Sequence, residues 1–334
     1  MGEKLTVQYA QRAPGALRSI EELFATIAAA LPERIIARVS EASAGRVRPR
    51  AIWANLRWAG RLREGDLVHQ TGDIHYAVLA VRKLPVVLTI HDLRFFEEAT
   101  GLKRFLFRWF WLELPCRKAS RVTVISEFTR QRLMAHCQVE SSKVRVIPNC
   151  VAPEFEPVEC SWPQSSPRML VVGTTPNKNL ERVVAACEGL DLSLSILGGP
   201  SDTQAKLLER TGLTFESHSG LSRAEVVGLY QSCDLVCFVS TYEGFGMPIL
   251  EGQATGRPVL SSNIPPMNEV AGDGALLVDP HDEKAIREGL LRLLGEPELR
   301  GELVRKGFEN VARYSATAIA AQYADLYREV QEEA

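Results

Sequence analysis

The sequence of 334 residues lacks several features that define large classes of proteins. Its seven cysteines form no Cys-x-x-Cys pair and no zinc-binding spacing, which excludes a disulfide-stabilised secreted scaffold and a structural zinc domain. No stretch reaches the roughly 18 to 20 apolar residues that span a bilayer, and no apolar segment follows Met1 as in a signal peptide. We therefore expect a cytoplasmic protein with reduced thiols.

Two motifs of ligand-binding enzymes are also absent. No Gly-x-Gly-x-x-Gly follows a predicted strand, which disfavours a Rossmann dehydrogenase. The chain has no Asp-x-Asp and no cluster of His, Asp or Glu at metal-ligand spacing, which disfavours an enzyme that depends on a divalent metal. We expect neither a metal site nor a bound cofactor.

Net charge is nearly absent, at −2 from 39 Lys and Arg against 41 Asp and Glu. With 46% hydrophobic residues, this balance excludes a disordered tail and a generic basic nucleic-acid binder. The total conceals an asymmetry. Residues 1–150 contain 24 basic and 14 acidic side chains, whereas the remainder contains 15 basic and 27 acidic ones. The chain is therefore divided into a basic half and an acidic half.

The length exceeds what a single hydrophobic core usually serves, so we expect two domains. In both halves short β-branched runs alternate with helical patterns, as is typical of parallel βαβ units. The predicted strands are Leu5–Tyr9, Arg34–Val39, Asp66–Gln70, Pro85–Ile90, Arg121–Ile125, Val144–Ile147, Arg168–Val172, Leu192–Leu197, Asp234–Val239 and Pro258–Ser261.

Four prolines between Pro153 and Pro167 predict an interdomain linker. We therefore predict an N-terminal domain over 1–155, a C-terminal domain over 156–315 and a final helix over 316–334. Two packing partners are open to that helix: the C-terminal domain, which it follows, and the N-terminal domain, onto which it would pack back.

The most informative segment is the loop and helix after the predicted strand that ends at Val239. Gly244 and Gly246 let the backbone approach a ligand closely. Pro248 then marks a helix start and Gly256 a helix end, so free N–H groups of the first turn face the loop and suit an anion.

Glu243 lies in this loop and Glu251 about one turn into the helix. Two carboxylates would repel an anion, so we expect them to accept hydrogen bonds from hydroxyl groups. A sugar phosphate offers both chemistries, and it is the ligand that this pattern favours. The alternative is a solvated helix N-terminus, where the helix dipole favours glutamate without any ligand.

Glu243 and Glu251, with Gly-Phe-Gly-Met-Pro between them, resemble the E-x7-E motif of glycosyltransferase family 4. Further segments are similar to that family in order and spacing: Thr89–Leu93, Val124–Glu127, Val146–Asn149, Val171–Asn179, Gly256–Leu260, Pro266–Gly272 and Ala275–Pro280. The resemblance is specific over about 165–315 and weak before residue 85. It implies an α/β protein of GT-B fold, with two Rossmann-like, doubly wound domains facing each other across a cleft.

For the C-terminal half, the resemblance implies a nucleotide-sugar site. Glu243 matches the acid that contacts the donor sugar, and Glu251 matches the acid that holds the ribose hydroxyls. Lys178 matches the lysine that neutralises the leaving diphosphate. The loop at Gly244 and the backbone amides of the next three residues are implied to face the sugar and the diphosphate: Phe245, Gly246 and Met247.

For the N-terminal half, the resemblance implies that His91 reaches the reacting sugar and that Gly15 stands for the family's glycine loop. A structural histidine at a strand end is the alternative for His91, and an ordinary lysine at a helix start is the alternative for Lys178. One departure concerns the diphosphate. Thr174 occupies the position where the family often has Arg, and either threonine hydroxyls or the Asn177 side chain would have to replace it.

The basic half contains two concentrated stretches. Between Arg34 and Arg63, eight arginines face a single acid and are interleaved with two tryptophans; Lys103–Trp111 then combines cations with aromatics. Nucleic acid is one interpretation, although no recognised binding module is present. An anionic membrane surface is another, and a solvated basic face over a core of aromatics is a third. Since the family's acceptors are often lipid-linked glycans, we hypothesise docking at the inner membrane face and no nucleic-acid partner.

Together these features predict a metal-independent, retaining glycosyltransferase. It is expected to move a hexose from a nucleotide sugar to a glycan or lipid-linked glycan in polysaccharide or glycolipid assembly, with mannose from GDP-mannose as the first choice of donor. Two alternatives stay open: a nucleotide-sugar epimerase or hydrolase of the same fold, and a non-catalytic sugar-binding protein.

Overall fold

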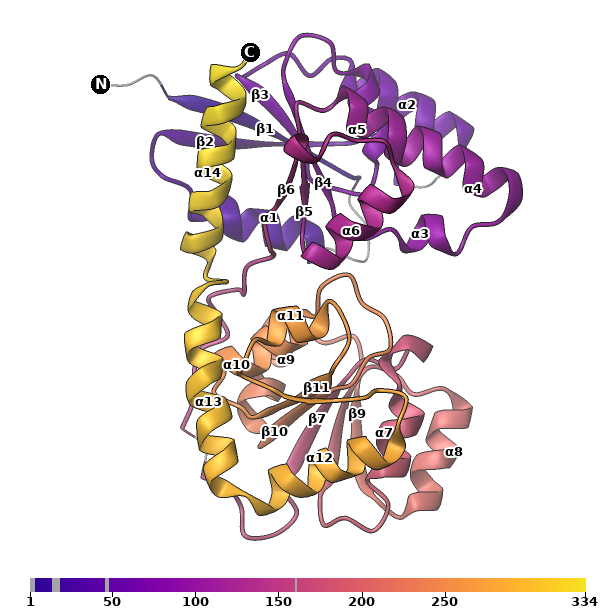
Figure 1. Ribbon diagram of the computed structural model, residues 1–334, viewed down its shortest axis with the longest axis vertical. Coiled ribbons are helices and arrows are strands. Elements are labelled where there is room, and N and C mark those ends of the chain that lie inside the picture. The colour runs from indigo at the N-terminus through magenta and orange to yellow at the C-terminus, as the bar shows by residue number, and fades with distance from the viewer. Residues whose placement is uncertain (1–3, 14–18, 46–47, 160) are drawn as a thin grey trace. The chain divides into compact units, whose positions relative to one another are not determined.

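The computed structural model describes residues 4–13, 19–45, 48–159 and 161–334. The chain forms two compact units, one made of Met1–Cys150 with Ala316–Ala334 and the other of Val151–Ser315 (Figure 1). The division lies five residues before the predicted boundary, and it assigns the C-terminal segment to the first unit. Counted over these units, the first contains 25 basic and 18 acidic residues and the second 14 and 23, so the charge asymmetry persists.

The first unit is built on a six-stranded parallel sheet with the order β2-β1-β3-β4-β5-β6. Its strands are β1 (Leu5–Gln11), β2 (Ile35–Glu41), β3 (Leu67–Gln70), β4 (Val86–Ile90), β5 (Arg121–Val124) and β6 (Val144–Val146). All five residues of β4 are buried, as expected for a central strand covered on both faces.

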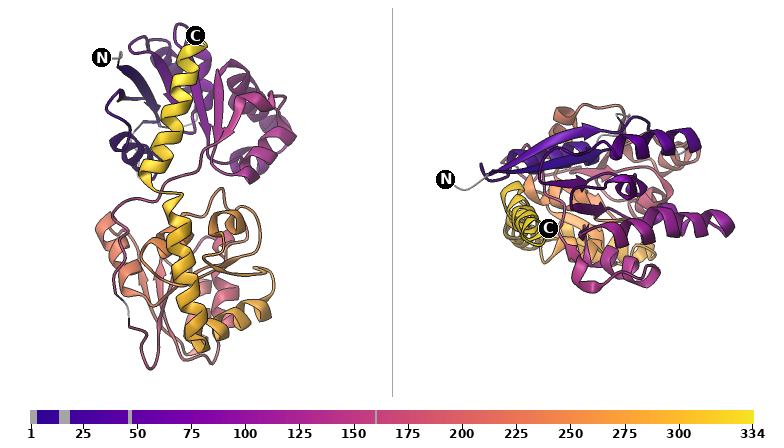
Figure 2. Two further views of the ribbon diagram at one scale, coloured as in Figure 1. Left: turned by 60° about the vertical axis from the view of Figure 1, so that its left-hand side comes forward. Right: turned by 90° about the horizontal axis from the view of Figure 1, so that it is seen from above.

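Helices flank this sheet (Figure 1). They are α1 (Ser19–Ala29), α2 (Pro49–Ala59), α3 (Arg94–Glu97), α4 (Gly101–Phe107), α5 (Leu114–Lys118), α6 (Glu127–His136) and α14 (Ala316–Glu332), with 3-10 turns η1 (His75–Ala80) and η3 (Ser141–Lys143) and a π-helical turn η2 (Arg108–Glu113). Figure 2 shows α14 running alongside the first unit's strands. Its apolar face joins the core around Tyr9 and Phe24, which explains why the last segment belongs to this unit.

The second unit is also built on a six-stranded parallel sheet, with the order β12-β11-β10-β7-β8-β9. Its strands are β7 (Arg168–Val172), β8 (Ser193–Leu197), β9 (Thr214–His218), β10 (Leu235–Phe238), β11 (Val259–Ser262) and β12 (Leu276–Val278). In order of appearance this is the 3-2-1-4-5-6 arrangement of the Rossmann fold. The predicted doubly wound α/β class is therefore confirmed.

The helices of the second unit are α7 (Leu180–Ala186), α8 (Asp202–Thr211), α9 (Arg223–Ser232), α10 (Met247–Ala254), α11 (Met267–Ala271), α12 (Glu283–Gly295) and α13 (Pro297–Ala312), with the 3-10 turn η4 (Pro176–Lys178). Helix α12 is capped at its N-terminus by Asp282, whose side chain accepts a hydrogen bond from the Lys284 amide. In the described part of the chain, no helix is both long enough and apolar enough to cross a membrane.

Strands β9 and β12 were not predicted, and they form the two edges of the second sheet. Strand β9 is mostly exposed and mixes polar with apolar residues, whereas β12 contains only three residues. The exposed strand β9 has a weak hydrophobic pattern, whereas β12 is apolar but too short to be recognised as a strand.

Candidate functional site

The second sheet reverses its winding direction between β7 and β10, which are neighbours although six elements of chain separate them. In open α/β sheets, ligands bind outside the carboxyl ends of the strands at such a switch point. The segments that follow these two strands contain Lys178 and Glu243, respectively. The loops are held together by a hydrogen bond from the Thr241 amide to the Asn177 carbonyl, at 2.8 Å.

Gly173 directly follows β7 and makes room for Lys178. Its φ is +91°, a conformation that residues with a Cβ rarely adopt. A Cβ at this position would lie 2.7 Å from Cγ of Lys178, so the lysine stem occupies the space that a side chain would need. The glycine therefore fixes both the turn and the course of the lysine.

We predict that Gly173→Ala lowers the free energy of unfolding by about 2 to 3 kcal/mol and displaces Lys178. Gly189→Ala is the matched control, because Gly189 has a φ of +72° but nothing within 4 Å of its added Cβ. The control should cost about 1 kcal/mol, from backbone strain alone. Urea unfolding measures both values, and equal costs would contradict the predicted clash with the lysine.

Lys178 and Glu243 form a half-buried ion pair, with Nζ 2.7 Å from Oε1 and side-chain exposures of 20% and 16%. Asn177 donates from Nδ2 to the same Oε1 at 3.1 Å and to the Tyr242 carbonyl at 3.0 Å. The ammonium group also lies 4.6 Å from the ring centroid of Phe238. Lys178 is the last residue of η4 and directly precedes Asn179, the N-cap residue of α7.

The loop that follows β10 leads into α10 as the sequence predicts. Gly244 lies in this loop, and Gly246, with a φ of +114°, precedes the first helical residue, Met247. The Phe245 side chain is buried and faces the ring of Tyr314, with centroids 6.0 Å apart. The first amides of a helix have no partner within it, so the start of α10 presents donors beside the Lys178–Glu243 pair.

Glu251 lies one turn into α10 and is hydrogen-bonded to Tyr230. The Tyr230 hydroxyl donates a hydrogen bond to Oε2 of Glu251 at 2.6 Å. Burial raises the pKa of Glu251, while this hydrogen bond and the nearby charges of Arg223 and Lys178 lower it. No sequence pattern pointed to Tyr230, which is 21 residues away from its partner.

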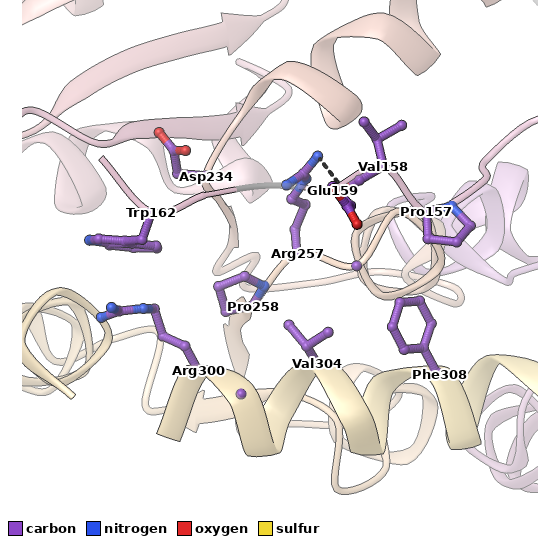
Figure 3. A pocket seen from close by; sticks show the side chains of 12 residues that line it. Pro157, Val158, Glu159, Trp162, Asp234, Arg257, Pro258, Arg300, Val304 and Phe308 are labelled. Carbon is purple, nitrogen blue, oxygen red and sulfur yellow. Dashed lines mark hydrogen bonds between the residues drawn. The ribbon is translucent and has the colours of Figure 1, made fainter. Parts of the chain in front are cut away.

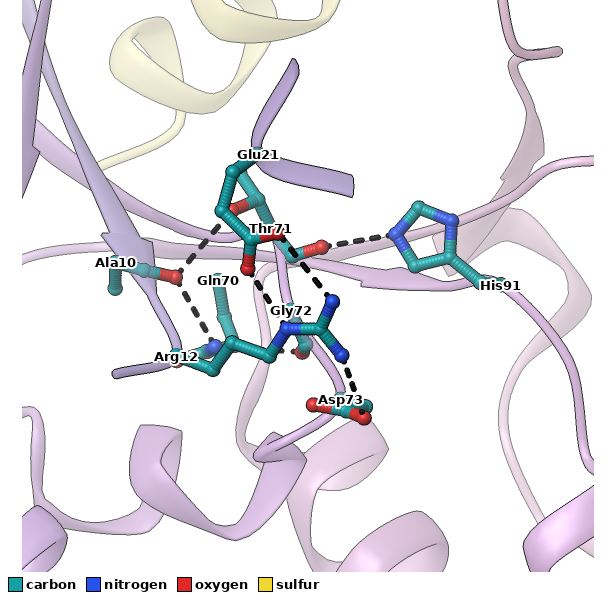
Figure 4. A network of polar contacts seen from close by, with 8 residues as sticks. All are labelled: Ala10, Arg12, Glu21, Gln70, Thr71, Gly72, Asp73 and His91. Atoms are coloured by element: carbon teal, nitrogen blue, oxygen red, sulfur yellow. Dashed lines mark hydrogen bonds and ion pairs between the residues drawn. The ribbon is translucent and has the colours of Figure 1, made fainter. Parts of the chain in front are cut away.

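His91 lies in the first unit, directly after β4, and it belongs to a polar network at the carboxyl end of that sheet (Figure 4). Its Nε2 is 2.9 Å from the Thr71 carbonyl oxygen, which accepts only, so Nε2 holds the proton and Nδ1 is left as an acceptor. Burial is the main influence on the pKa of His91 and lowers it, so the ring is neutral at pH 7.

Arg12 is the cation of this network, and no sequence pattern pointed to it. It follows β1 and pairs with Glu21, with 2.7 Å between Nε and Oε1, and with Asp73 at 3.4 Å from Nη1 (Figure 4). The Arg12 backbone passes close to Gly72, since an added Cβ there would lie 3.3 Å from its amide nitrogen. Gly15, the predicted glycine loop, lies outside the described residues.

The two candidates to replace the family arginine make other contacts. The Thr174 hydroxyl donates to the Gly199 carbonyl at 3.0 Å, and the Asn177 side chain holds Glu243 as described above. Both therefore shape the loops in this structure. The described residues contain no group of three or more His, Cys, Asp or Glu arranged to hold a metal ion.

Two family models match consecutive segments of the chain. The model of Glycosyltransferase Family 4 matches residues 9–155, and the model of Glycosyl transferases group 1 matches residues 155–310. The chain belongs to glycosyltransferase family 4. Its fold is GT-B, and the protein is a glycosyltransferase.

Similar proteins agree with this assignment. An O-antigen chain mannosyltransferase of Salmonella typhimurium is 24% identical over 78% of this chain and 75% of its own length. An MMP alpha-(1->4)-mannosyltransferase of Mycolicibacterium hassiacum is 28% identical over 80% of this chain and 72% of its own. The crystal structure of Anabaena HepE, in complex with UDP and glucose, has a TM-score of 0.78 at 15% identity and covers 97% of this chain and 100% of that protein.

Proposed function

We propose that the second unit of this glycosyltransferase binds a nucleotide-sugar donor between Lys178, Glu243 and the start of α10, and transfers the sugar with retention of configuration. The observation on which this rests is the half-buried Lys178–Glu243 pair at the switch point of the second sheet, beside the first turn of α10. A cation, helix amides and hydroxyl-binding carboxylates in one place suit a phosphorylated sugar.

The chemistry follows from where charge develops. When the glycosidic bond to the diphosphate breaks, negative charge grows on the leaving phosphate oxygens. The Lys178 ammonium and the first amides of α10 are fixed donors for that charge, and we propose that they act without a metal ion. Glu243 pairs with Lys178 before the donor binds, so the lysine side chain keeps its position while no diphosphate is bound.

We propose that Glu251 accepts hydrogen bonds from the ribose hydroxyls and that Glu243 contacts the donor sugar. Tyr230 occupies Oε2 of Glu251, and the described residues offer no partner for Oε1. A carboxylate accepts several hydrogen bonds, so Oε1 is suited to a hydroxyl group. In the first unit we propose that neutral His91 acts on the sugar through Nδ1.

For the donor we propose a hexose, with mannose from GDP-mannose as the first choice, because the O-antigen and MMP relatives are both named mannosyltransferases. For the acceptor we propose a glycan or lipid-linked glycan in surface polysaccharide or glycolipid assembly. The complex of HepE with UDP and glucose makes UDP-glucose the competing donor to test.

A thermal-shift screen against UDP, GDP, ADP and their sugar derivatives tests the donor site. We expect the nucleotides of one base to raise the unfolding temperature of the protein by several degrees at saturating concentration. No shift with any nucleotide would contradict the proposed donor site. Hydrolysis or epimerisation of the donor with no acceptor present would favour the epimerase or hydrolase alternative over transfer.

For the first unit we propose that an exposed basic aromatic surface binds anionic lipids at the inner membrane face. This surface is formed by α4 and the start of η2: Leu102, Lys103, Arg104, Phe105, Leu106, Arg108 and Phe110. Leu102 is 72% exposed and Phe105 is 57% exposed, which is unusual for large apolar side chains. The aromatics of this stretch are thus not all in the core, as a solvated basic face would require.

A shallow cavity of about 320 Å³ adjoins this surface and is lined by Arg104, Arg108 and His136. Neither Arg104 nor Arg108 forms an ion pair in the described part of the chain, although Glu97 lies 4.0 Å from His136, so both guanidinium groups suit a headgroup phosphate. Exposed apolar side chains beside such cations are the combination that binds to the membrane interface.

Vesicle co-sedimentation tests this surface. We expect the protein to sediment with vesicles containing anionic phosphatidylglycerol and not with neutral phosphatidylcholine. Charge reversal by Arg104→Glu with Arg108→Glu should reduce the bound fraction at least about fivefold, because each cation near the surface contributes about 1 kcal/mol. Reversal of Arg305, which is exposed on α13 in the second unit, is the control. Equal binding to both vesicles would overturn the proposal.

A further inference from the structure

Tyr230 links a buried hydrogen-bond network to the carboxylate of Glu251. Its side chain is fully buried on α9, and its hydroxyl donates to Oε2 of Glu251 at 2.6 Å. Both the ring and the backbone carbonyl of Tyr230 contact neighbouring residues, so its position is fixed from several directions.

The ring of Tyr230 packs edge-to-face on Phe155, with centroids 5.3 Å apart and planes at 88°. Its carbonyl accepts hydrogen bonds from Nε of Arg257 and Sγ of Cys233, both at 3.2 Å. Arg257 is only 1% exposed and also donates from Nη2 to the Gln231 carbonyl at 2.6 Å. These contacts fasten the C-terminal end of α9.

Figure 3 shows Arg257 in the wall of a cavity with a dashed hydrogen bond to the linker, which is the bond from Nη2 to the Val158 carbonyl at 3.4 Å. Arg257 therefore connects three segments: the linker, the end of α9 and the start of β11, which Pro258 joins to Arg257 in the chain. A guanidinium with several backbone acceptors is a rigid clamp, since its planar fork loses little freedom per bond.

We propose that Tyr230 is a positioning residue, which holds the Glu251 carboxylate in the orientation that receives the nucleotide ribose. The proposal rests on the donor site described under the proposed function. A glutamate has three rotatable side-chain bonds, so without a partner its carboxylate samples several orientations. One strong hydrogen bond to Oε2 selects one of them and directs Oε1 toward the ligand.

Electrostatics gives this role a signature that packing alone would not. Burial raises the pKa of Glu251, and three neighbours lower it: the Tyr230 hydroxyl and Arg223 on α9, and Lys178 on η4. The ionised carboxylate is a stronger hydrogen-bond acceptor for ribose hydroxyls than the protonated carboxyl group. Nucleotide affinity should therefore fall as the pH drops through the pKa of Glu251, and loss of the Tyr230 hydroxyl should move that fall to higher pH.

The test is isothermal titration of Tyr230→Phe with whichever of UDP, GDP and ADP the wild-type protein binds. The substitution keeps the ring on Phe155 and removes only the hydroxyl. We expect about a tenfold weaker affinity, the size of one hydrogen bond to a charged group, with the fitted stoichiometry reporting the folded fraction. Tyr76→Phe is the matched control, because it removes a buried hydroxyl bonded to Asn55 in the first unit and should leave nucleotide affinity unchanged.

Two further measurements separate positioning from stability. The acid-side fall of affinity should lie at higher pH in Tyr230→Phe than in wild type, whereas Glu251→Gln should remove the part of this fall that Glu251 contributes. The phosphate groups titrate in the same range, but they contribute equally to every variant. In the double variant Tyr230→Phe with Glu251→Gln, the effect of Tyr230→Phe on nucleotide affinity should largely vanish, since Tyr230 acts through Glu251.

The outcomes distinguish this proposal from the one on which it rests. If wild type binds no nucleoside diphosphate, the proposed donor site is wrong. If wild type binds and Tyr230→Phe matches it in affinity and pH profile, only the positioning role is overturned. Additive losses in the double variant would also overturn it.

Discussion

Lys178→Ala lowers kcat/KM for the donor by at least about 100-fold, the size expected when one donor to a developing oxyanion is removed. The ammonium group lies at the end of η4, held by Glu243 and the face of Phe238, and the segments between β7 and α7 and between β10 and α10 contain no other lysine or arginine. Its removal also leaves the half-buried Glu243 without its cation, so the loss should affect both donor binding and turnover. Steady-state kinetics with varied donor measures both.

Lys206→Ala provides the control for this experiment. Lys206 is exposed on α8 in the same unit, so its substitution removes the same charge from the domain without touching the site. If net charge alone attracted the donor, the two variants would lose activity equally. Wild-type kinetics in Lys178→Ala would refute the assignment of Lys178 to the diphosphate.

His91→Ala lowers kcat by about 100-fold or more but leaves nucleotide affinity unchanged. The residues proposed to hold the nucleotide all belong to the second unit, whereas His91 belongs to the first. A loss confined to turnover is therefore expected, and nucleotide titration of the same variant checks it. His136→Ala is the control, because His136 is also a partly buried imidazole of the first unit that faces an aromatic ring, and it should keep the wild-type kcat.

The pH dependence of kcat gives a second test of His91. Its pKa is lowered by burial, and its proposed role needs the neutral ring. Protonation should therefore slow the enzyme only when the pH falls below the ordinary histidine value of about 6.5. A decline in kcat that begins above that value, and that is absent from His91→Asn, would contradict the neutral acceptor role.

The loop after β10 illustrates what local sequence predicts well. Gly246 and Gly256, both at positive φ, and the proline at 248 mark a turn, a helix start and a helix end; α10 runs from Met247, one residue before Pro248, to Ala254, two residues before Gly256. Those signals act through φ and through missing N–H groups, which are properties of each residue itself. The central strands are predicted for a similar reason, since buried apolar runs such as β4 stand out in any sequence.

The partners within the candidate site follow a different rule. Nothing near Glu251 in the sequence distinguishes Tyr230 from the other tyrosines, and nothing near Arg12 indicates Glu21 and Asp73. Each pair is joined only by tertiary packing, since Tyr230 on α9 meets Glu251 on α10, and Arg12 after β1 meets Glu21 on α1 and Asp73 after β3. The same is true of Lys178 and Glu243: a family motif indicates each residue separately but does not predict the ion pair between them.

Local sequence patterns predict the doubly wound α/β class, the two halves of opposite charge, and a loop after β10 whose glutamates and helix start suit a phosphorylated sugar. Hydrophobic period, backbone preference and charge are local quantities, so they can be read without coordinates. Only the folded chain reveals the ion pair of Lys178 with Glu243, the hydroxyl bonded to Glu251, the tautomer of His91, and the packing of α14 on the first unit. Those depend on strand order and burial, because contacts between distant residues arise only when the whole chain has packed.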